Sequence, residues 1–105
     1  MNAKEIYKLC LLMQERKGSD YQNTNSSVKQ IDYYPNGVKD IVCMMHTKLT
    51  RIRSCLDADF VNNESIEDSA YDLINYTTFL IMYLNYSFDG QTKDKDIFNN
   101  EIPGR

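Results

Sequence analysis

Apolar residues recur at helical spacing in three separate segments of this chain. The first segment covers residues 3–17, and its apolar positions are Ile6, Leu9, Cys10 and Met13. Spacings of i, i+3, i+4 and i+7 place such residues on one face of an α-helix. Gly18 follows as a candidate C-cap, after the positive charges of Arg16 and Lys17, which suit a helix C-terminus. The pattern predicts a helix that ends near residue 17.

A second and longer apolar stripe predicts a helix from about Val38 to Leu56. Its members are Val38, Ile41, Val42, Met45, Leu49, Ile52 and Leu56. A stripe of this kind is typical of the buried seam of a helical bundle. The polar sequence DADFVNN, residues 57–63, ends the segment.

The third segment starts near Ser65, which forms a capping-box pattern with Asp68 three residues later. Apolar and small residues line one side: Ile66, Ala70, Leu73, Ile74, Thr77, Leu80, Ile81 and Leu84. The opposite side is polar at first and then aromatic: Glu64, Asp68, Asp72, Asn75, Phe79, Tyr83 and Tyr86. A helix with two such sides is expected to be covered on both, and a second subunit is one candidate for the cover.

These segments, without any convincing strand pattern, predict an all-α fold: a small bundle of three main helices. A chain of 105 residues buries a modest share of its surface, so we expect oligomerisation to complete the bundle. The helical domain should span residues 1–88. Residues 89–105 are polar and contain Gly and Pro, which indicates a tail or a partner-clasping arm. The polar stretch 19–37 is long for a connection in so small a domain, and such loops are often functional.

Charge and hydropathy argue against two classes of partner. A net charge of −3 and a pI near 5.0 disfavour binding to a nucleic-acid backbone, which usually requires a clustered basic face. No run of 18 apolar residues occurs, so no membrane span is expected. The N-terminus lacks the features of a secretory signal, and we expect the protein in the cytoplasm.

Three cysteines, Cys10, Cys43 and Cys55, lie at helical positions among apolar residues and form no CxxC pair. In an intracellular protein this pattern indicates buried thiols. A zinc site needs more ligands than the single His46 can add. We therefore expect no zinc site, and a structural or exposed His46.

Carboxylates cluster at the start of the third segment. Asp68 and Asp72, at i and i+4, share a helix face, where like charges destabilise a helix unless something neutralises them. The helix dipole favours acidic groups in the first turn, but Asp72 lies beyond most of that benefit. One or two carboxylates are what Mg²⁺ uses together with substrate phosphates and water. Spacing alone leaves two interpretations open: a solvated acidic helix start, or a Mg²⁺ site.

Basic and loop residues supply further candidates. Lys48 and Arg51 are i, i+3 neighbours that could hold a triphosphate, or could pair with Asp68 and Asp72 across the bundle. In KGSDY, residues 17–21, Asp20 is either a plain turn residue or part of a ligand pocket. The residues alone do not decide between these alternatives.

Three short elements together resemble a known family: KGSDY (17–21), KLTRIRS (48–54) and ESIEDSAYDLINY (64–76). Through them, residues 3–84 resemble the nucleotide-modification-associated domain of phages and bacteria. That domain is similar to the MazG-like all-α nucleoside triphosphate pyrophosphatases. The positions that carry the resemblance are Lys17, Asp20, Tyr21, Lys48, Arg51, Glu64, Asp68, Asp72, Leu73, Asn75 and Tyr76.

The resemblance implies a Mg²⁺-dependent helical domain that acts on or binds nucleotides and forms a dimer or higher oligomer. In the MazG-like enzymes, carboxylate-bound metals activate the water that cleaves between the α and β phosphorus atoms. Carried over, Asp68 and Asp72 would be metal ligands, with Glu64 as a third. The substrate-binding residues would be Lys17, Asp20, Tyr21, Lys48, Arg51, Asn75 and Tyr76.

This chain departs from the MazG-like pattern on its second helix, where those enzymes carry Glu-x-x-Glu and this chain has Lys48 and Arg51. Three functions therefore stay open. The first is a (d)NTP pyrophosphohydrolase, working in the host cytoplasm if a phage encodes it. The second is a nucleotide-binding protein that sequesters a signal of host defence without hydrolysing it. The third is a protein–protein interaction module.

Overall fold

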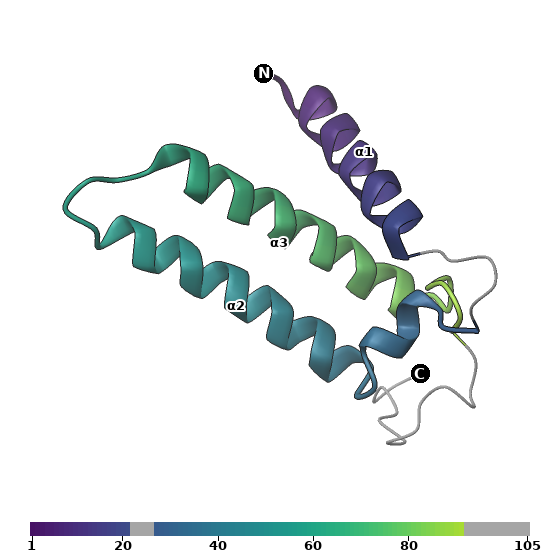
Figure 1. The fold of residues 1–105 in the computed structure, drawn as a ribbon. Helices are drawn as coiled ribbons and strands as arrows, with labels where there is room; N and C mark the ends of the chain where they lie inside the picture. The colour runs from purple at the N-terminus through teal and green to yellow at the C-terminus, as the bar shows by residue number, and fades with distance from the viewer. Residues whose placement is uncertain (22–26, 92–105) are drawn as a thin grey trace.

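The computed structural model describes residues 1–21 and 27–91 of the chain, with the side chains of residues 17–21 left out. Its elements in order are α1 (Ala3–Tyr21), the 3₁₀ helix η1 (Gln30–Tyr33), α2 (Val38–Leu56) and α3 (Asn63–Leu84). The described ranges contain helices and no strand, which confirms the all-α prediction (Figure 1). None of the described helices has the length and apolarity that crossing a membrane requires.

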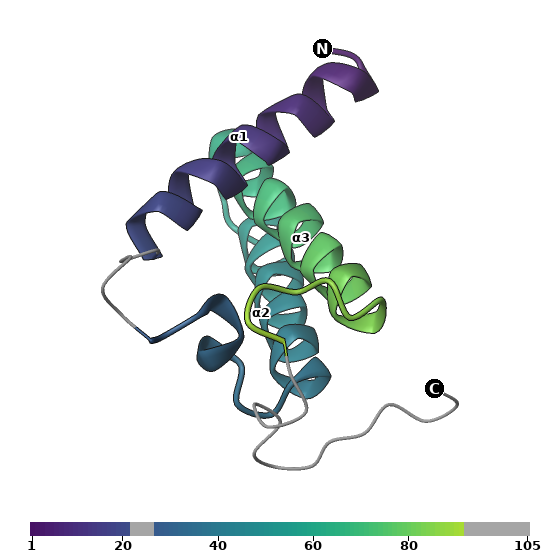
Figure 2. The same cartoon turned by 90° about the vertical axis from the view of Figure 1, so that its right-hand side faces the viewer.

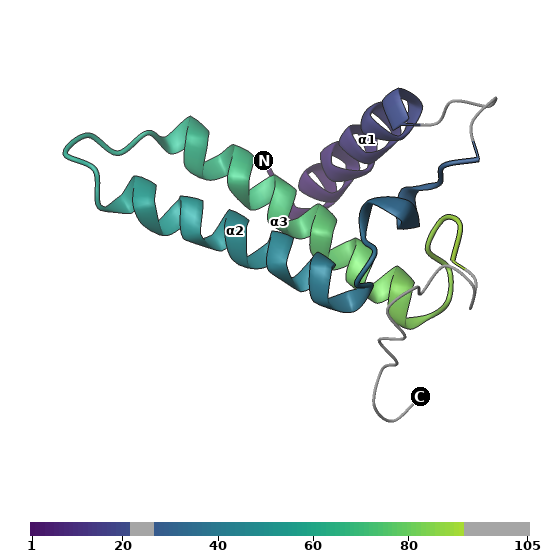
Figure 3. The same ribbon diagram turned by 60° about the horizontal axis from the view of Figure 1, so that its bottom comes forward.

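The helices α2 and α3 form an antiparallel pair, joined by the short loop of residues 57–62. α1 crosses α3 steeply instead of running along it (Figure 2, Figure 3). Met1 reaches Tyr71 and Gln14 reaches Asn75, so most of the length of α1 spans about one turn of α3. The α2–α3 pair is therefore the main packed unit, and α1 is added to one side of it.

The start of α2 is held close to the end of α3. Gly37 precedes α2 with a φ of 59°, in the left-handed region that favours glycine. A Cβ atom at this position would lie 2.7 Å from Tyr83 Oη, so the close approach also requires glycine. Asp40 accepts hydrogen bonds from the backbone N–H and the side-chain amide of Asn36, at 2.7 and 3.0 Å. These bonds fix the turn that leads into α2.

The start of α3 differs from the prediction. The helix begins at Asn63, and its N-cap is Asn62, whose Oδ1 accepts a hydrogen bond from the Ser65 N–H at 3.1 Å. The predicted capping box of Ser65 and Asp68 is therefore wrong. The reason is that Asn62 is itself a strong N-cap residue, and it starts the helix one turn earlier.

The fully buried core lies where η1 meets the C-terminal end of α3. Four of its members are Ile31, Ile41, Tyr83 and Phe88. The ring of Phe88 lies 5.7 Å from that of Tyr34 and 5.6 Å from that of Phe79, both nearly edge-on. Edge-to-face pairs of this kind add to the stabilisation from apolar burial. Sequence periodicity did not indicate this cluster, because half of it comes from η1 and the loop after α3.

The segment after α3 folds back along η1. Asp89 accepts a hydrogen bond from the Ile31 N–H through its backbone oxygen at 3.2 Å, and Gln91 Nε2 donates to the Tyr83 backbone oxygen at 2.9 Å. Residues 92–105, most of the predicted tail or arm, lie outside the described residues. The division into residues 1–88 and 89–105 therefore stays a prediction.

Two further predictions of local structure are wrong. α1 continues to Tyr21, so Gly18 is not its C-cap and KGSDY belongs to the helix. The thiols are not all buried: Cys10 is, but Cys43 is exposed and Cys55 is half-buried. Helical position among apolar residues did not decide burial, because α1 covers only part of the α2–α3 pair.

The apolar stripe predicted for α2 is only partly buried. Ile41 is fully buried, whereas Val42, Leu49 and Leu56 are 45%, 48% and 57% exposed. The stripe is wider than the surface that α3 can cover, so one edge of it faces away from the bundle. His46 is exposed, which is one of the two alternatives predicted for it, and Arg53 is exposed as well.

Candidate functional site

The candidate site is built on the contact between the middle of α2 and the middle of α3. Lys48 Nζ lies 3.0 Å from Asp72 Oδ2, and the two side chains are only 13% and 19% exposed. This is the pairing across the bundle that the sequence left open as one role for Lys48. Because water screens the pair poorly, the attraction is stronger than between two surface charges, although both charges have also lost hydration.

Helical geometry assigns the residues around this contact to one side of the α2–α3 pair. At about 100° per residue, Lys48 and Arg51 lie about 20° and 80° to one side of the buried Ile41. Asp72 and Asn75 lie about 20° and 80° to the same side of the buried Tyr83 on α3. In an antiparallel pair, these two sides form one face. We call it the polar face, and its residues are Lys48, Arg51, Glu64, Asp68, Asp72 and Asn75.

The opposite side of the same pair is apolar. Val42 and Leu49 lie about 100° and 80° to the other side of Ile41, and Ile66 and Leu84 lie about 100° to the other side of Tyr83. We call this the open face, and its residues are Val42, Leu49, Leu56, Ile66, Ala70, Thr77, Ile81 and Leu84. Five of these residues are large hydrophobics that are more than a third exposed: Val42, Leu49, Leu56, Ile81 and Leu84.

Asn75 is the most deeply buried residue of the polar face, with 5% of its surface exposed. Its Oδ1 accepts a hydrogen bond from Gln14 Nε2 of α1 at 2.7 Å. Its Nδ2 has no acceptor among the described residues. A buried donor without a partner costs about 1–3 kcal/mol, so this amide requires a water or a ligand to explain it.

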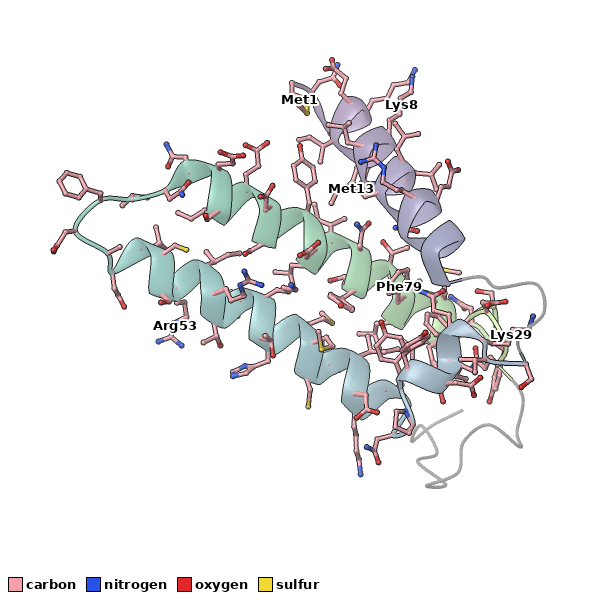
Figure 4. All side chains as sticks on the ribbon, in the orientation of Figure 1. Met1, Lys8, Met13, Lys29, Arg53 and Phe79 are labelled. Carbon is pink, nitrogen blue, oxygen red and sulfur yellow. The ribbon has the colours of Figure 1, made fainter. Side chains whose placement is uncertain are left out.

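α1 lies over this end of the polar face. Figure 4 shows Met13 on the side of α1 that faces α3, and Lys8 on its far side. Cys10 is buried on the same side, and this burial raises the pKa of its thiol. Loss of solvent and then the nearby Glu67 carboxylate raise the pKa of Tyr71, where the helices cross.

Sequence reasoning missed Gln14 and Cys10 as neighbours of the site. Gln14 is four residues from Cys10 and therefore shares its helix face. That spacing was the available signal, but it could not show that α1 crosses α3 at Asn75.

The remaining predicted site residues differ in position and in exposure to solvent. Arg51, Glu64 and Asp68 are exposed on the polar face, within one or two helical turns of the Lys48–Asp72 pair. Tyr76 is half-buried, with its ring edge-on to Phe79 at 5.9 Å, so it packs inside the bundle. The side chains of Lys17, Asp20 and Tyr21 lie outside the described groups.

The donor set fits one hard cation and does not fit two. Among the described residues, no three acidic, His or Cys side chains gather closely enough to form a complete metal cage. Asp68 and Asp72 share one helix face, and Mg²⁺ is often held by one or two carboxylates plus phosphate oxygens. The corresponding positions on α2 are Lys48 and Arg51, so the second carboxylate pair of a two-metal centre is absent from the described helices.

Comparison with known proteins gives no family for this chain. No protein-family model, no curated protein and no solved structure matches it. The resemblance described above therefore depends on its motif residues alone, and the interpretation of the site depends on its geometry.

Proposed function

We propose that this protein is a phage-type nucleotide-handling protein that binds a (d)NTP as its Mg²⁺ complex on the polar face. The observation that carries the proposal is the Lys48–Asp72 pair beside Asn75, whose buried amide N–H lacks an acceptor in the described structure. Cation, anion and spare donor are the three groups that a metal–triphosphate complex can satisfy together.

Binding of the complex would exchange the partners of the ion pair. Mg²⁺ would take the place of Lys48 at the Asp72 carboxylate, and Lys48 would turn to a phosphate oxygen. No charge is left without a partner in this exchange, so the loss of the Lys48–Asp72 contact is offset. Arg51 is exposed at the next turn of α2 and can bind a phosphate through two parallel hydrogen bonds.

Asn75 and Gln14 would orient the bound nucleotide. The free Nδ2 of Asn75 can donate to a ligand oxygen while its Oδ1 stays bound to Gln14. Asp68 would complete the carboxylate ligands, with Glu64 as the third. Asn75 and Tyr76 then support the site, as the resemblance implies, and Tyr76 does so by packing.

Nucleotide binding has two candidate outcomes, hydrolysis of the nucleotide or its sequestration. If the bound Mg²⁺ activates water, as in the MazG-like enzymes, the reaction is pyrophosphohydrolysis between the α and β phosphorus atoms. The position of the carboxylates favours the other outcome, in which the protein sequesters its nucleotide without turnover. All three candidate ligands come from α3, and Lys48 already neutralises one of them.

Self-association and cellular location belong to the same proposal. A protein of this kind would act in the cytoplasm, where nucleotides are found. Its small core, with few residues fully buried, supports assembly as a dimer or a higher oligomer.

Thermal unfolding with a panel of NTPs, dNTPs and cyclic nucleotides, with and without Mg²⁺, tests the proposal. A ligand at about 100 times its Kd stabilises the folded state by about 2.7 kcal/mol, which raises Tm by about 10 °C or more in a domain of this size. Chromatography of the same samples separates turnover from binding, because sequestration returns the nucleotide intact.

Asp72→Asn should remove the dependence on Mg²⁺ and keep the helical circular-dichroism signal. Asp57→Asn is the matched control, because Asp57 is an exposed carboxylate at the far end of α2. If Asp72→Asn and Asp57→Asn bind the nucleotide and Mg²⁺ alike, the site assignment is wrong. If no nucleotide shifts Tm in either condition, the nucleotide proposal is wrong and an interaction module is the better interpretation.

A further inference from the structure

α1 shields Asn75 from solvent. At about 100° per residue, Glu64, Asp68 and Asn75 lie within about 40° of one another around α3. Glu64 and Asp68 are exposed, whereas Asn75 is only 5% exposed. α1 crosses α3 at Asn75, where Gln14 donates its hydrogen bond (Figure 2). Because residues on the same side of α3 differ in this way, we attribute the burial of Asn75 to α1.

This burial separates Asn75 from any ligand in solution. The proposed function has the Nδ2 of Asn75 donate to a ligand oxygen, and that atom is buried without an acceptor among the described residues. A hydrogen bond of this kind joins atoms about 2.7–3.2 Å apart, a distance that a ligand in solvent cannot reach while α1 stays docked. α1 must therefore move before the ligand can bind Asn75.

The apolar contact that holds α1 on α3 is small. On the side of α1 that faces α3, Cys10 is buried, while Ile6 and Met13 are only half-buried (Figure 4). On its other sides, Leu11 and Leu12 are 54% and 50% exposed. Segments with few buried apolar contacts open locally at a lower free energy than global unfolding requires. The described part of α1 has this character.

The polar contacts between α1 and α3 can break without disturbing the rest of the polar face. Gln14 Nε2 donates to Asn75 Oδ1 at 2.7 Å, and the Tyr71 hydroxyl donates to Met1 Sδ, a weak acceptor, at 3.5 Å. The ion pair of the polar face joins α2 to α3 and does not involve α1. Movement of α1 therefore uncovers Asn75 while the carboxylate and the ammonium group of that pair keep their positions.

α1 can also return after the ligand has entered, because Gln14 and the ligand use different atoms of Asn75. Gln14 binds Oδ1, and the ligand oxygen would bind Nδ2. The bond from Gln14 fixes the side-chain amide with its N–H groups available to the ligand. The docked helix would then keep water away from this contact, which slows the exchange of the ligand for solvent.

We infer that α1 is a lid on the polar face: it opens to admit the triphosphate group with its Mg²⁺, and it closes over the bound group with the Gln14–Asn75 hydrogen bond formed again. The inference rests on the proposed function, because a ligand of the polar face is what requires access to Asn75. Since the lid is closed in the free protein, binding should be slow, as is usual where association needs a conformational change.

Cys10 reports the opening of the lid without any nucleotide. The chain has three cysteines, and replacing the exposed Cys43 and the half-buried Cys55 by Ser leaves Cys10 as the single thiol. A maleimide should label Cys10 at a rate that rises less steeply with urea, below the unfolding transition, than the global unfolding constant does, because undocking of α1 exposes only part of the buried surface. Equal steepness would mean that α1 leaves α3 only when the whole domain unfolds, and would overturn the inference.

Two matched variants of the single-thiol protein test which contacts keep the lid closed. Ile6→Ala should raise the labelling rate of Cys10 about tenfold, because it removes apolar contact between α1 and α3. Leu11→Ala makes a similar reduction on an exposed side of the same helix and should change the rate less than about twofold. Equal rates in the two variants would show that the inner side of α1 does not hold a lid in place.

Inorganic triphosphate with Mg²⁺ tests the coupling to the ligand, because it has the groups that the polar face is proposed to bind and no base. At saturation it should slow the labelling of Cys10 about tenfold, and omission of Mg²⁺ should abolish this protection. If Mg²⁺ and triphosphate raise Tm but leave the labelling rate unchanged, the lid is refuted and the proposed function stands. If neither triphosphate nor any nucleotide raises Tm, the proposed function is refuted and the lid with it, even where Cys10 shows local opening.

Discussion

The two faces of the α2–α3 pair are made by the same two helices but leave opposite kinds of group unsatisfied. The polar face has a largely buried ion pair and an amide N–H without an acceptor in the described structure. The open face has apolar side chains, such as Val42 and Leu49, that remain about half exposed. Hydrogen-bonding groups require partners in definite directions, whereas apolar groups require only a surface that shields them from water. One face is therefore suited to a small polar ligand and the other to a protein surface.

The two faces also differ in which helices fix their structure. Ile41 lies between them, fully buried, with its neighbour Val42 already on the open face. The polar face is further shaped by α1 through the Gln14–Asn75 hydrogen bond. The open face is shaped by α2 and α3 alone, so changes in α1 should affect the two faces unequally.

The largest expected effect is a loss of stability on substitution of Ile41, the buried residue that lies between the two faces. Ile41→Ala should lower the free energy of unfolding by about 2–5 kcal/mol, because it leaves a cavity in a fully packed site. Val42→Ala, one residue away and 45% exposed, should lower it by less than about 1 kcal/mol. Urea denaturation at low protein concentration, where self-association contributes little, compares the two. Equal losses would mean that the two positions are covered alike.

A smaller effect of opposite sign is expected on the polar face. Asn75→Leu removes the unpaired buried donor and should raise the free energy of unfolding by about 1 kcal/mol, since Gln14 is half-buried and can turn to water. The same variant should lose nucleotide binding. Denaturation and thermal shift on one preparation measure both. A loss of stability comparable to that of a core cavity would show that Asn75 is structural.

The smallest expected effect concerns the packing of α1 on the rest of the bundle. It is measured as a rate of thiol modification and not as a change in stability. Cys10 is buried and the pKa of its thiol is raised by burial, whereas Cys43 is exposed on α2. Because the thiolate is the reactive form, Cys10 should react with a thiol reagent at neutral pH at least about ten times more slowly than Cys43. Its rate should rise with pH as the deprotonated fraction grows. Mass spectrometry of partly labelled protein assigns the sites, and equal rates would mean that α1 does not stay docked.

Much of the fold could be predicted, because helical periodicity depends on local sequence. The predicted bounds of α2, Val38 and Leu56, are those of the structure. Periodicity could not tell which flank of the α2 stripe α3 covers, so Val42, Leu49 and Leu56 were expected to be buried. The ends of α1 and α3 were less accurate, because they depend on cap residues such as Asn62.

The site was predicted in part. Lys48 and Asp72 were singled out by charge and spacing, and the structure brings them together. The role of Asn75 was suggested only by the family resemblance. Its hydrogen bond to Gln14 joins residues 61 positions apart, and no local pattern carries information about such a contact. Nucleotide and Mg²⁺ binding stay predictions.

The short loop of residues 57–62 has a consequence for the order of folding. It brings α2 and α3 together with little loss of chain entropy, so this hairpin can form early, as local contacts generally do. Docking of α1 requires contacts between residues far apart in the chain and should come later. Pulsed hydrogen exchange would then protect α2 and α3 before α1. A newly made chain would present both faces of the hairpin before α1 docks.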